Sequence, residues 1–443
     1  MKLLFYLFML NFCVMFMKNY LFIFLGNLMF MILFIMLFFV NNNGYWMLIY
    51  SNLGLDKFSY CLILLSLWII SMMYFVSKID SNIKLYSLVI LALMIILFLS
   101  FASMNLLMFY LFFEISLIPV FMLIMGWGYQ YERINASMYM LIYTLFFSLP
   151  MMVLIYMFYL MFNSLSFFML LKMMMNLDYW VYMIYFFMYM VFMVKLPLFL
   201  VHIWLPKAHV EAPVAGSMIL AGVMLKLGGY GLMRMMMLML MSITLNMLFM
   251  ELGMVGMLLL SLLCLRQYDL KKLVAYSSVV HMMMMMMGLF SMTFWGYLGG
   301  YFMMVGHGLC SSGLFILVNY MYMRSKSRNI LVNKGLVYFM PSMMMFWFLF
   351  VMNNMAAPIS LNLLSEIMII AILLNWSQNI LFLLILLMFF GACYNLYMYS
   401  YSYHGMYSNM LLKIFNNNIL EFYVMLFHFI PLNLLILKIN YII

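Results

Sequence analysis

Uninterrupted apolar stretches of about 20 residues recur along almost the whole chain, which is the length a helix needs to cross a hydrocarbon layer about 30 Å thick. Only 7% of the 443 residues are charged, whereas a soluble domain carries roughly 25%, so the chain lacks the polar side chains of a water-facing surface. The apolar runs are continuous and do not alternate with a period of two residues, which favours helices over a transmembrane barrel. We therefore expect an all-α polytopic membrane protein.

The hydropathy pattern predicts about fourteen transmembrane segments. They run roughly over residues 3–17, 20–40, 57–77, 84–103, 105–127, 135–161, 179–203, 213–233, 244–265, 272–290, 294–323, 336–374, 379–400 and 420–440.

Two of these segments are predicted to be broken. The seventh ends in a cluster of prolines, and the twelfth is interrupted by two asparagines and a proline (Pro197, Pro206 and Pro213; Asn353, Asn354 and Pro358). The two segments lie an odd number of membrane crossings apart, so if they belong to an internal repeat, its second copy is inverted in the membrane. Paired broken helices in inverted halves point to a transport site. We expect N-terminal helices over 1–103, a first repeat over 84–233, an inverted second repeat over 244–400 and a C-terminal helix in 401–443.

The basic residues between the segments predict the orientation. Thirteen follow odd-numbered segments and three follow even-numbered ones, so the odd loops should face the matrix or cytoplasm and both termini the opposite side. The odd set is Lys18, Lys78, Lys84, Arg133, Lys207, Arg266, Lys271, Lys272, Arg324, Lys326, Arg328, Lys334 and Lys413, and the even set is Lys57, Lys172 and Arg234.

Several function classes find no support in the sequence. The basic residues form no stripe with interleaved aromatics, so nucleic-acid binding is not expected despite the formal charge of +10. The scattered cysteines form no CxxC or CxxCH motif, which argues against an iron–sulfur cluster or c-type haem. The glycine runs Gly228–Gly231 and Gly299–Gly300 lie in apolar segments without a preceding strand, so close helix packing explains them better than nucleotide binding.

Four charged residues lie inside apolar segments. Glu114 falls about 13 Å into the fifth segment, Lys226 about 20 Å along the eighth and Glu366 about 12 Å beyond Pro358, while Lys195 precedes Pro197 by two residues. A bare charge at mid-bilayer costs at least about 2.5 kcal/mol, so such residues are expected to be paired or hydrated. Structural ion pairs, such as Glu114 with Lys195, are one interpretation. A proton or ion path is the other, and the adjacent helix breaks favour it.

Two histidines could extend that path. His281 precedes a run of six methionines, and His307 lies at mid-depth of the eleventh segment. An imidazole gains and loses a proton near neutral pH, so each could act as a relay or as a hydrogen-bonded packing residue. For His202 and His209, which flank the break in the seventh segment, packing is slightly favoured over gating or capping.

Five blocks of sequence resemble the antiporter-like proton-translocating subunits of respiratory complex I. They are Val194–Ser217, Leu220–Arg234, Arg266–His281, His307–Phe315 and Pro358–Glu366. The resemblance implies fourteen helices with two inverted five-helix repeats. It also implies that Glu114 and Lys195 form the coupled pair of a first half-channel, that Lys226 is a central relay, and that His281 and His307 link it to Glu366. The methionine run after His281 departs from the mixed small and apolar residues expected there.

The resemblance further implies a subunit of a proton-translocating NADH:ubiquinone reductase. No redox centre or metal is expected in this chain, since NADH, FMN, iron–sulfur clusters and ubiquinone would be bound by other subunits. Partners would be other membrane-arm subunits, including the antiporter-like chains 2 and 5, and membrane lipids. The 64 methionines suggest a mitochondrial genetic code, hence the mitochondrial inner membrane with both termini on the intermembrane-space side. The alternative is a stand-alone cation/proton antiporter of the same fold.

Overall fold

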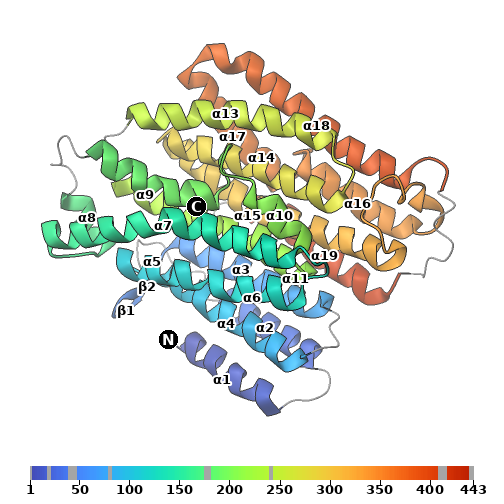
Figure 1. Ribbon diagram of the computed structural model, residues 1–443, viewed down its shortest axis with the longest axis horizontal. Coiled ribbons are helices and arrows are strands. Elements are labelled where there is room, and N and C mark those ends of the chain that lie inside the picture. Colours follow the sequence, from blue (N-terminus) through green and yellow to red (C-terminus); the bar gives the residue numbers. More distant parts are fainter. Residues whose placement is uncertain are drawn as a thin grey trace. The chain divides into compact units, whose positions relative to one another are not determined.

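The computed structural model describes residues 2–16, 21–37, 47–77, 82–173, 181–238, 243–407 and 417–438. Within these ranges ten helical stretches are long and apolar enough to cross a membrane, and three shorter apolar helices accompany them. The chain is thus a multi-pass helical membrane protein (Figure 1). The number fourteen and the inverted repeats stay predictions. The loop cations Lys18, Lys78 and Lys413 lie outside the described residues.

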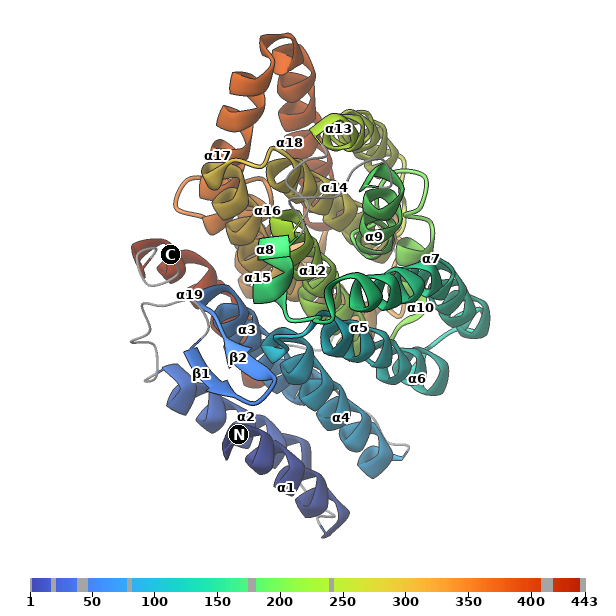
Figure 2. The ribbon, with the colours of Figure 1, turned by 90° about the vertical axis from the view of Figure 1, so that its left-hand side faces the viewer.

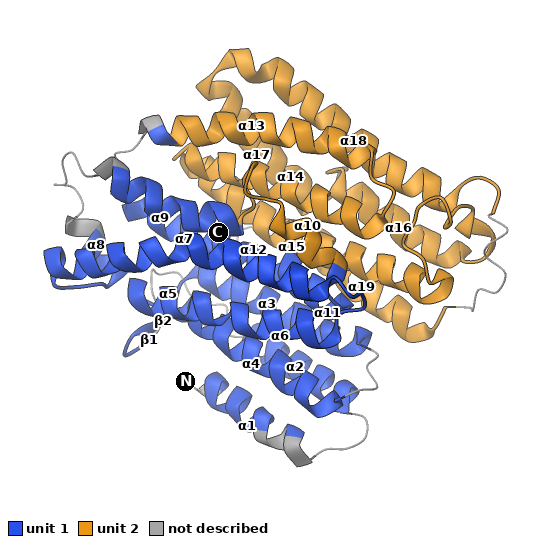
Figure 3. Ribbon diagram, in the orientation of Figure 1, with its two compact units in different colours: residues 1–195, 211–245, 440–443 blue, residues 196–210, 246–439 orange. Residues whose placement is uncertain are grey.

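The chain divides into two compact units (Figure 3). Unit 1 takes the described residues of Met1–Lys195 and Glu211–Leu245, and unit 2 those of Leu196–Val210 and Asn246–Ile439. The helix before the break in the seventh segment therefore belongs to unit 1, and the helix that follows the break belongs almost entirely to unit 2.

In unit 1, helices α1 and α2 lie beside α4 and α3 (Figure 2). The almost completely buried α12 contacts α9, α8 and α4. The elements of this unit are α1 (Lys2–Phe16), α2 (Leu21–Leu37), β1 (Met47–Tyr50), β2 (Leu53–Leu55), α3 (Lys57–Val76), α4 (Ile83–Ala102), α5 (Leu106–Ile115), α6 (Leu117–Trp127), α7 (Arg133–Phe162), α8 (Phe167–Met173), α9 (Val181–Lys195), α11 (Val214–Ile219), the π-helical turn Leu220–Met224 and α12 (Leu225–Leu238).

In unit 2, the long buried helix α15 is central and contacts α14, α16, α17 and α19. The helices are α10 (Trp204–Glu211, its last residue in unit 1), α13 (Ile243–Leu265, which starts in unit 1), α14 (Leu270–Phe290), α15 (Phe294–Ser325), α16 (Pro341–Asn354), α17 (Leu361–Trp376), α18 (Leu381–Tyr403) and α19 (Ile419–Leu434), with 3₁₀ turns at Leu336–Tyr338, Gln378–Ile380 and Leu435–Lys438.

Both predicted helix breaks are confirmed. In the seventh segment α9 ends at Lys195 and α10 begins at Trp204, and in the twelfth α16 ends at Asn354 and α17 begins at Leu361. Each break holds side-chain-bearing residues in the left-handed region: Leu200 at φ 81° in the first, Ala356 at φ 56° and Ile359 at φ 69° in the second. Such residues cost of order 1–3 kcal/mol each and persist where surrounding packing dictates them, often at functional sites.

Two features differ from the sequence prediction. A short antiparallel hairpin of β1 and β2 precedes α3, so the chain is not entirely α-helical. The fifth segment is also broken, since α5 ends at Ile115 and α6 starts at Leu117. Pro119 explains this break, because a proline removes the N–H that would bond to the carbonyl four residues earlier and its ring crowds that carbonyl. Glu114 therefore sits in the last turn of α5.

The glycine runs pack helices together, as predicted. A Cβ at Gly231 would collide with the rings of Phe192 and Phe109, so α12 approaches α9 and α5 closely only because this residue lacks a side chain. In unit 2, a Cβ at Gly299 would meet Ile369 of α17 at 3.1 Å, and one at Gly300 would meet Leu289 of α14 at 2.9 Å.

Candidate functional site

Lys195 is the last residue of α9 and its side chain is 3% exposed. Its Nζ lies 3.8 Å from the centroid of the Phe113 ring, on helix α5. The Glu114 carboxylate, on the next residue along α5, interacts electrostatically with this ammonium group. Among the described residues, no group meets full hydrogen-bond geometry with the carboxylate oxygens of Glu114 or with Nζ of Lys195, although the Ser148 hydroxyl lies near the carboxylate. The two charges thus lie near each other without forming a direct salt bridge.

Lys226 is fully buried and follows the π-helical turn Leu220–Met224. In that turn the Leu225 N–H bonds to the carbonyl of Leu220, five residues back. Nζ of Lys226 donates a hydrogen bond of 2.5 Å to the carbonyl of Ala221. Single π-helical turns are rare and frequently mark functional sites, and here the turn supplies a backbone dipole to a buried ammonium group.

The other three predicted residues meet in unit 2. His281 of α14 places Nδ1 3.5 Å from Oε1 of Glu366, on α17, and both side chains are less than a tenth exposed. The rings of His281 and His307, on α15, have centroids 5.6 Å apart. Three residues chosen from sequence positions far apart therefore form one cluster.

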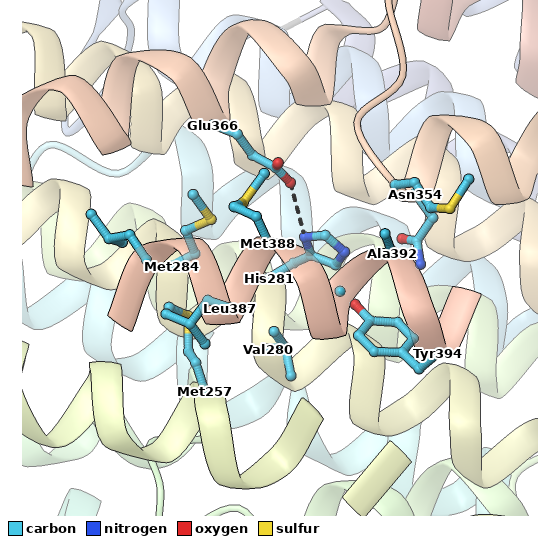
Figure 4. Close-up of a pocket in the computed structure, with 13 residues that line it drawn as sticks. Met257, Val280, His281, Met284, Asn354, Glu366, Leu387, Met388, Ala392 and Tyr394 are labelled. Atoms are coloured by element: carbon cyan, nitrogen blue, oxygen red, sulfur yellow. Dashed lines mark ion pairs between the residues drawn. The ribbon is translucent and has the colours of Figure 1, made fainter. Parts of the chain in front are cut away.

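A cavity of about 40 Å³ adjoins this cluster (Figure 4). A single buried water needs roughly 10–15 Å³, so the cavity has room for water. His281, Glu366, Asn354 and Tyr394 give it polar groups, and Tyr394 points its hydroxyl toward the His281 ring. Nε2 of His281 is buried and makes no hydrogen bond to the described part of the chain, so a water in the cavity would satisfy it. Met284, from the methionine run, also lines the cavity.

The remaining histidines near the first break pack against aromatic rings. His202 stacks on Phe199 with centroids 5.8 Å apart, and His209 stacks on Phe315 with centroids 4.8 Å apart. These contacts agree with the packing interpretation of both residues.

Sequence reasoning missed three features. Arg234, counted as a loop cation, lies in α12 and forms a buried salt bridge with Asp56 before α3. Phe113 and Tyr394 also went unnoticed, because 44 phenylalanines and 34 tyrosines make any single aromatic residue unremarkable. The position of Phe113 next to Glu114 was the only available signal. The predicted link between Lys226 and His281 joins residues of different units and stays a prediction.

Comparison with known proteins agrees with this picture. A model of the NADH:quinone oxidoreductase/Mrp antiporter transmembrane family matches residues 103–391, and one for the amino terminus of NADH-ubiquinone oxidoreductase chain 4 matches residues 1–100. NADH-ubiquinone oxidoreductase chain 4 of Ceratitis capitata is 48% identical over 391 residues, covering 87% of each chain. The Locusta migratoria protein of the same name is 43% identical, covering 88% of each chain.

A solved structure shares the fold. It is a chain of respiratory complex I from Thermus thermophilus with bound NADH, which superimposes with a TM-score of 0.84 and covers 93% of this chain and 90% of its own length. Its sequence identity is 22%, so this likeness supports the architecture.

Proposed function

This chain belongs to the family of NADH-ubiquinone oxidoreductase chain 4, and from that premise we propose that it is a membrane-arm subunit of respiratory complex I that translocates protons. Electron transfer from NADH to ubiquinone, with its cofactors, takes place in other subunits. We place the chain in the mitochondrial inner membrane among the antiporter-like chains 2 and 5 and membrane lipids, with both termini on the intermembrane-space side. The extreme methionine content and the distribution of basic residues support this placement.

Two groups of residues carry the proposed proton path. Lys195 and Glu114 form the first, and the position of the carboxylate governs how tightly the buried ammonium holds its proton. Lys226 receives that proton next, with the Ala221 carbonyl holding its ammonium form. His281, His307 and Glu366 form the second group, where the cavity provides water. The observation that carries the proposal most directly is this buried histidine–carboxylate pair beside a water-sized cavity.

Replacing Lys195 with methionine in the intact complex tests the function. We expect NADH-driven proton translocation in sealed vesicles to fall about tenfold or more, because no other group at the end of α9 can carry the proton. The complex should still assemble, since methionine fills a similar volume without a buried charge. Full translocation by this variant at normal assembly would contradict the proposal.

The alternative, a stand-alone cation/proton antiporter, makes a different prediction. The purified chain alone, reconstituted in liposomes without NADH-oxidising partners, would then exchange sodium or potassium for protons. We expect no such exchange, because proton movement here depends on charge changes that the partner subunits supply.

Filling the cavity tests the role of its water. A Cβ at Gly391 of α18, which lines the cavity, would meet no heavy atom within 4 Å, so a Gly391→Leu side chain meets no clash at its first carbon. We expect proton translocation to fall about tenfold while assembly is retained, because the water beside His281 is displaced. Gly126→Leu in α6 is the matched control, since a Cβ there also meets nothing within 4 Å. Equal translocation by both variants would show that the cavity water is dispensable.

A further inference from the structure

The ammonium of Lys195 lies over the ring of Phe113, on helix α5. The carboxylate of Glu114 is on the next residue of α5, yet the ammonium does not form a salt bridge with it. Nζ lies 3.8 Å from the Phe113 centroid, well inside the roughly 6 Å range of cation–π attraction. The site is desolvated, since Lys195 is 3% exposed and Phe113 is fully buried, and such contacts are strongest where water is absent. The cation–π contact with Phe113 therefore helps to fix the position of the Lys195 ammonium.

The ring itself is fixed by its neighbours. Phe113 contacts Phe109 on its own helix and Phe192 on α9, with centroids 5.8 Å away in both cases. Phe192 lies three residues before Lys195, so the same helix end that carries the lysine also holds the ring beneath it. The C-terminus of α9 adds the negative end of a helix dipole, which favours a cation at this position. A charged Lys195 is thus stabilised without a salt bridge to Glu114.

We propose that Phe113 is a positioning residue that holds protonated Lys195 apart from Glu114. The ammonium then has two alternative sites, the ring face and the carboxylate. This inference rests on the proposed function. Without the ring, the ammonium has a single partner of opposite charge in a dry environment and settles on it as a static ion pair. A static ion pair cannot pass its proton onward. The ring therefore keeps the ammonium of Lys195 mobile, so that the first half-channel can transfer protons.

Substitutions at Phe113 in the intact complex separate the ring's electrostatic role from its volume. Leucine and methionine keep an apolar side chain of comparable size but remove the quadrupole, whereas tyrosine and tryptophan keep it. We expect NADH-driven proton translocation to fall about tenfold in the Phe113→Leu and Phe113→Met complexes, and to stay near normal in Phe113→Tyr. If tryptophan does not fit the aromatic cluster, the tyrosine variant still decides. A purely structural role predicts the opposite order, with the smaller aliphatic side chains tolerated best.

Two controls complete the experiment. Phe158→Leu removes a buried ring of α7 whose ring neighbour is Phe162, and should leave translocation near normal. A cryo-electron microscopy structure of the Phe113→Leu complex should show Nζ of Lys195 within salt-bridge distance of Glu114. Normal translocation in Phe113→Leu, alongside loss in Lys195→Met, would overturn this inference and leave the proposed function standing. Normal translocation in both variants would contradict the proposed function itself.

Discussion

Replacing Lys226 with arginine should abolish proton translocation through this subunit almost as completely as replacing it with methionine. Both variants keep a long side chain at a fully buried position, but arginine keeps the charge and methionine does not. Arginine does not release its proton in proteins, so it can occupy the site beside the Ala221 carbonyl without relaying anything. We expect NADH-driven proton translocation to fall about tenfold or more in both complexes.

The arginine variant distinguishes a relay from a structural charge. If Lys226 merely anchors the π-helical turn through its hydrogen bond, arginine should restore function that methionine loses, because its guanidinium also donates to a carbonyl. The amount of assembled complex, measured by native electrophoresis, is the control for the extra volume that arginine brings. If the arginine variant assembles normally and translocates protons at the normal rate, Lys226 is not a proton relay.

The helices and the two predicted breaks could be found from sequence because their causes are local. An apolar run of membrane-spanning length can be recognised from the residues of that run alone. Pro197 and Pro358 each remove a backbone N–H donor whatever the surrounding fold. The buried charges were equally visible, since a charged residue within a long apolar run has no solvent to face. The proximity of His281 to Glu366 came from family resemblance, because hydropathy alone does not indicate which helices touch.

The parts that sequence reasoning missed depend on tertiary packing. The break between α5 and α6 follows from Pro119, yet prolines are also tolerated inside membrane helices, as Pro150 within α7 shows. The pairing of Asp56 with Arg234 joins residues far apart in the chain, and no local pattern predicts it. Phe113 gains its role only from Lys195, whose ammonium lies over its ring, and Tyr394 only from His281, toward which its hydroxyl points.

In both units a buried ionisable residue lies next to a break in a helix. Lys195 ends α9 immediately before the first break, and Glu366 lies in the second turn of α17 after the other. Backbone groups freed at a break can hold water or balance charge, which an intact helix cannot offer within a membrane. The residues in the left-handed region, Leu200 in the first break and Ala356 and Ile359 in the second, show that the backbone at each break departs from the local preference of residues with a side chain. The breaks thus create the polar environment in which a buried ionisable group can change its protonation.

Replacing Glu366 with glutamine should stop proton translocation while sparing assembly. The substitution keeps the shape of the side chain 3.5 Å from Nδ1 of His281 but removes the group that accepts and releases a proton. Removing one partner of a permanently charged buried pair costs about 3–5 kcal/mol, whereas a histidine that can give up its proton leaves no stranded charge. We therefore expect translocation to fall about tenfold or more, with the thermal stability of the complex nearly unchanged. Glu366→Asp, which retains the carboxylate on a shorter side chain, should recover part of the activity. A Glu366→Gln complex that is markedly less stable but still translocates protons would instead show that the pair only holds α14 and α17 together.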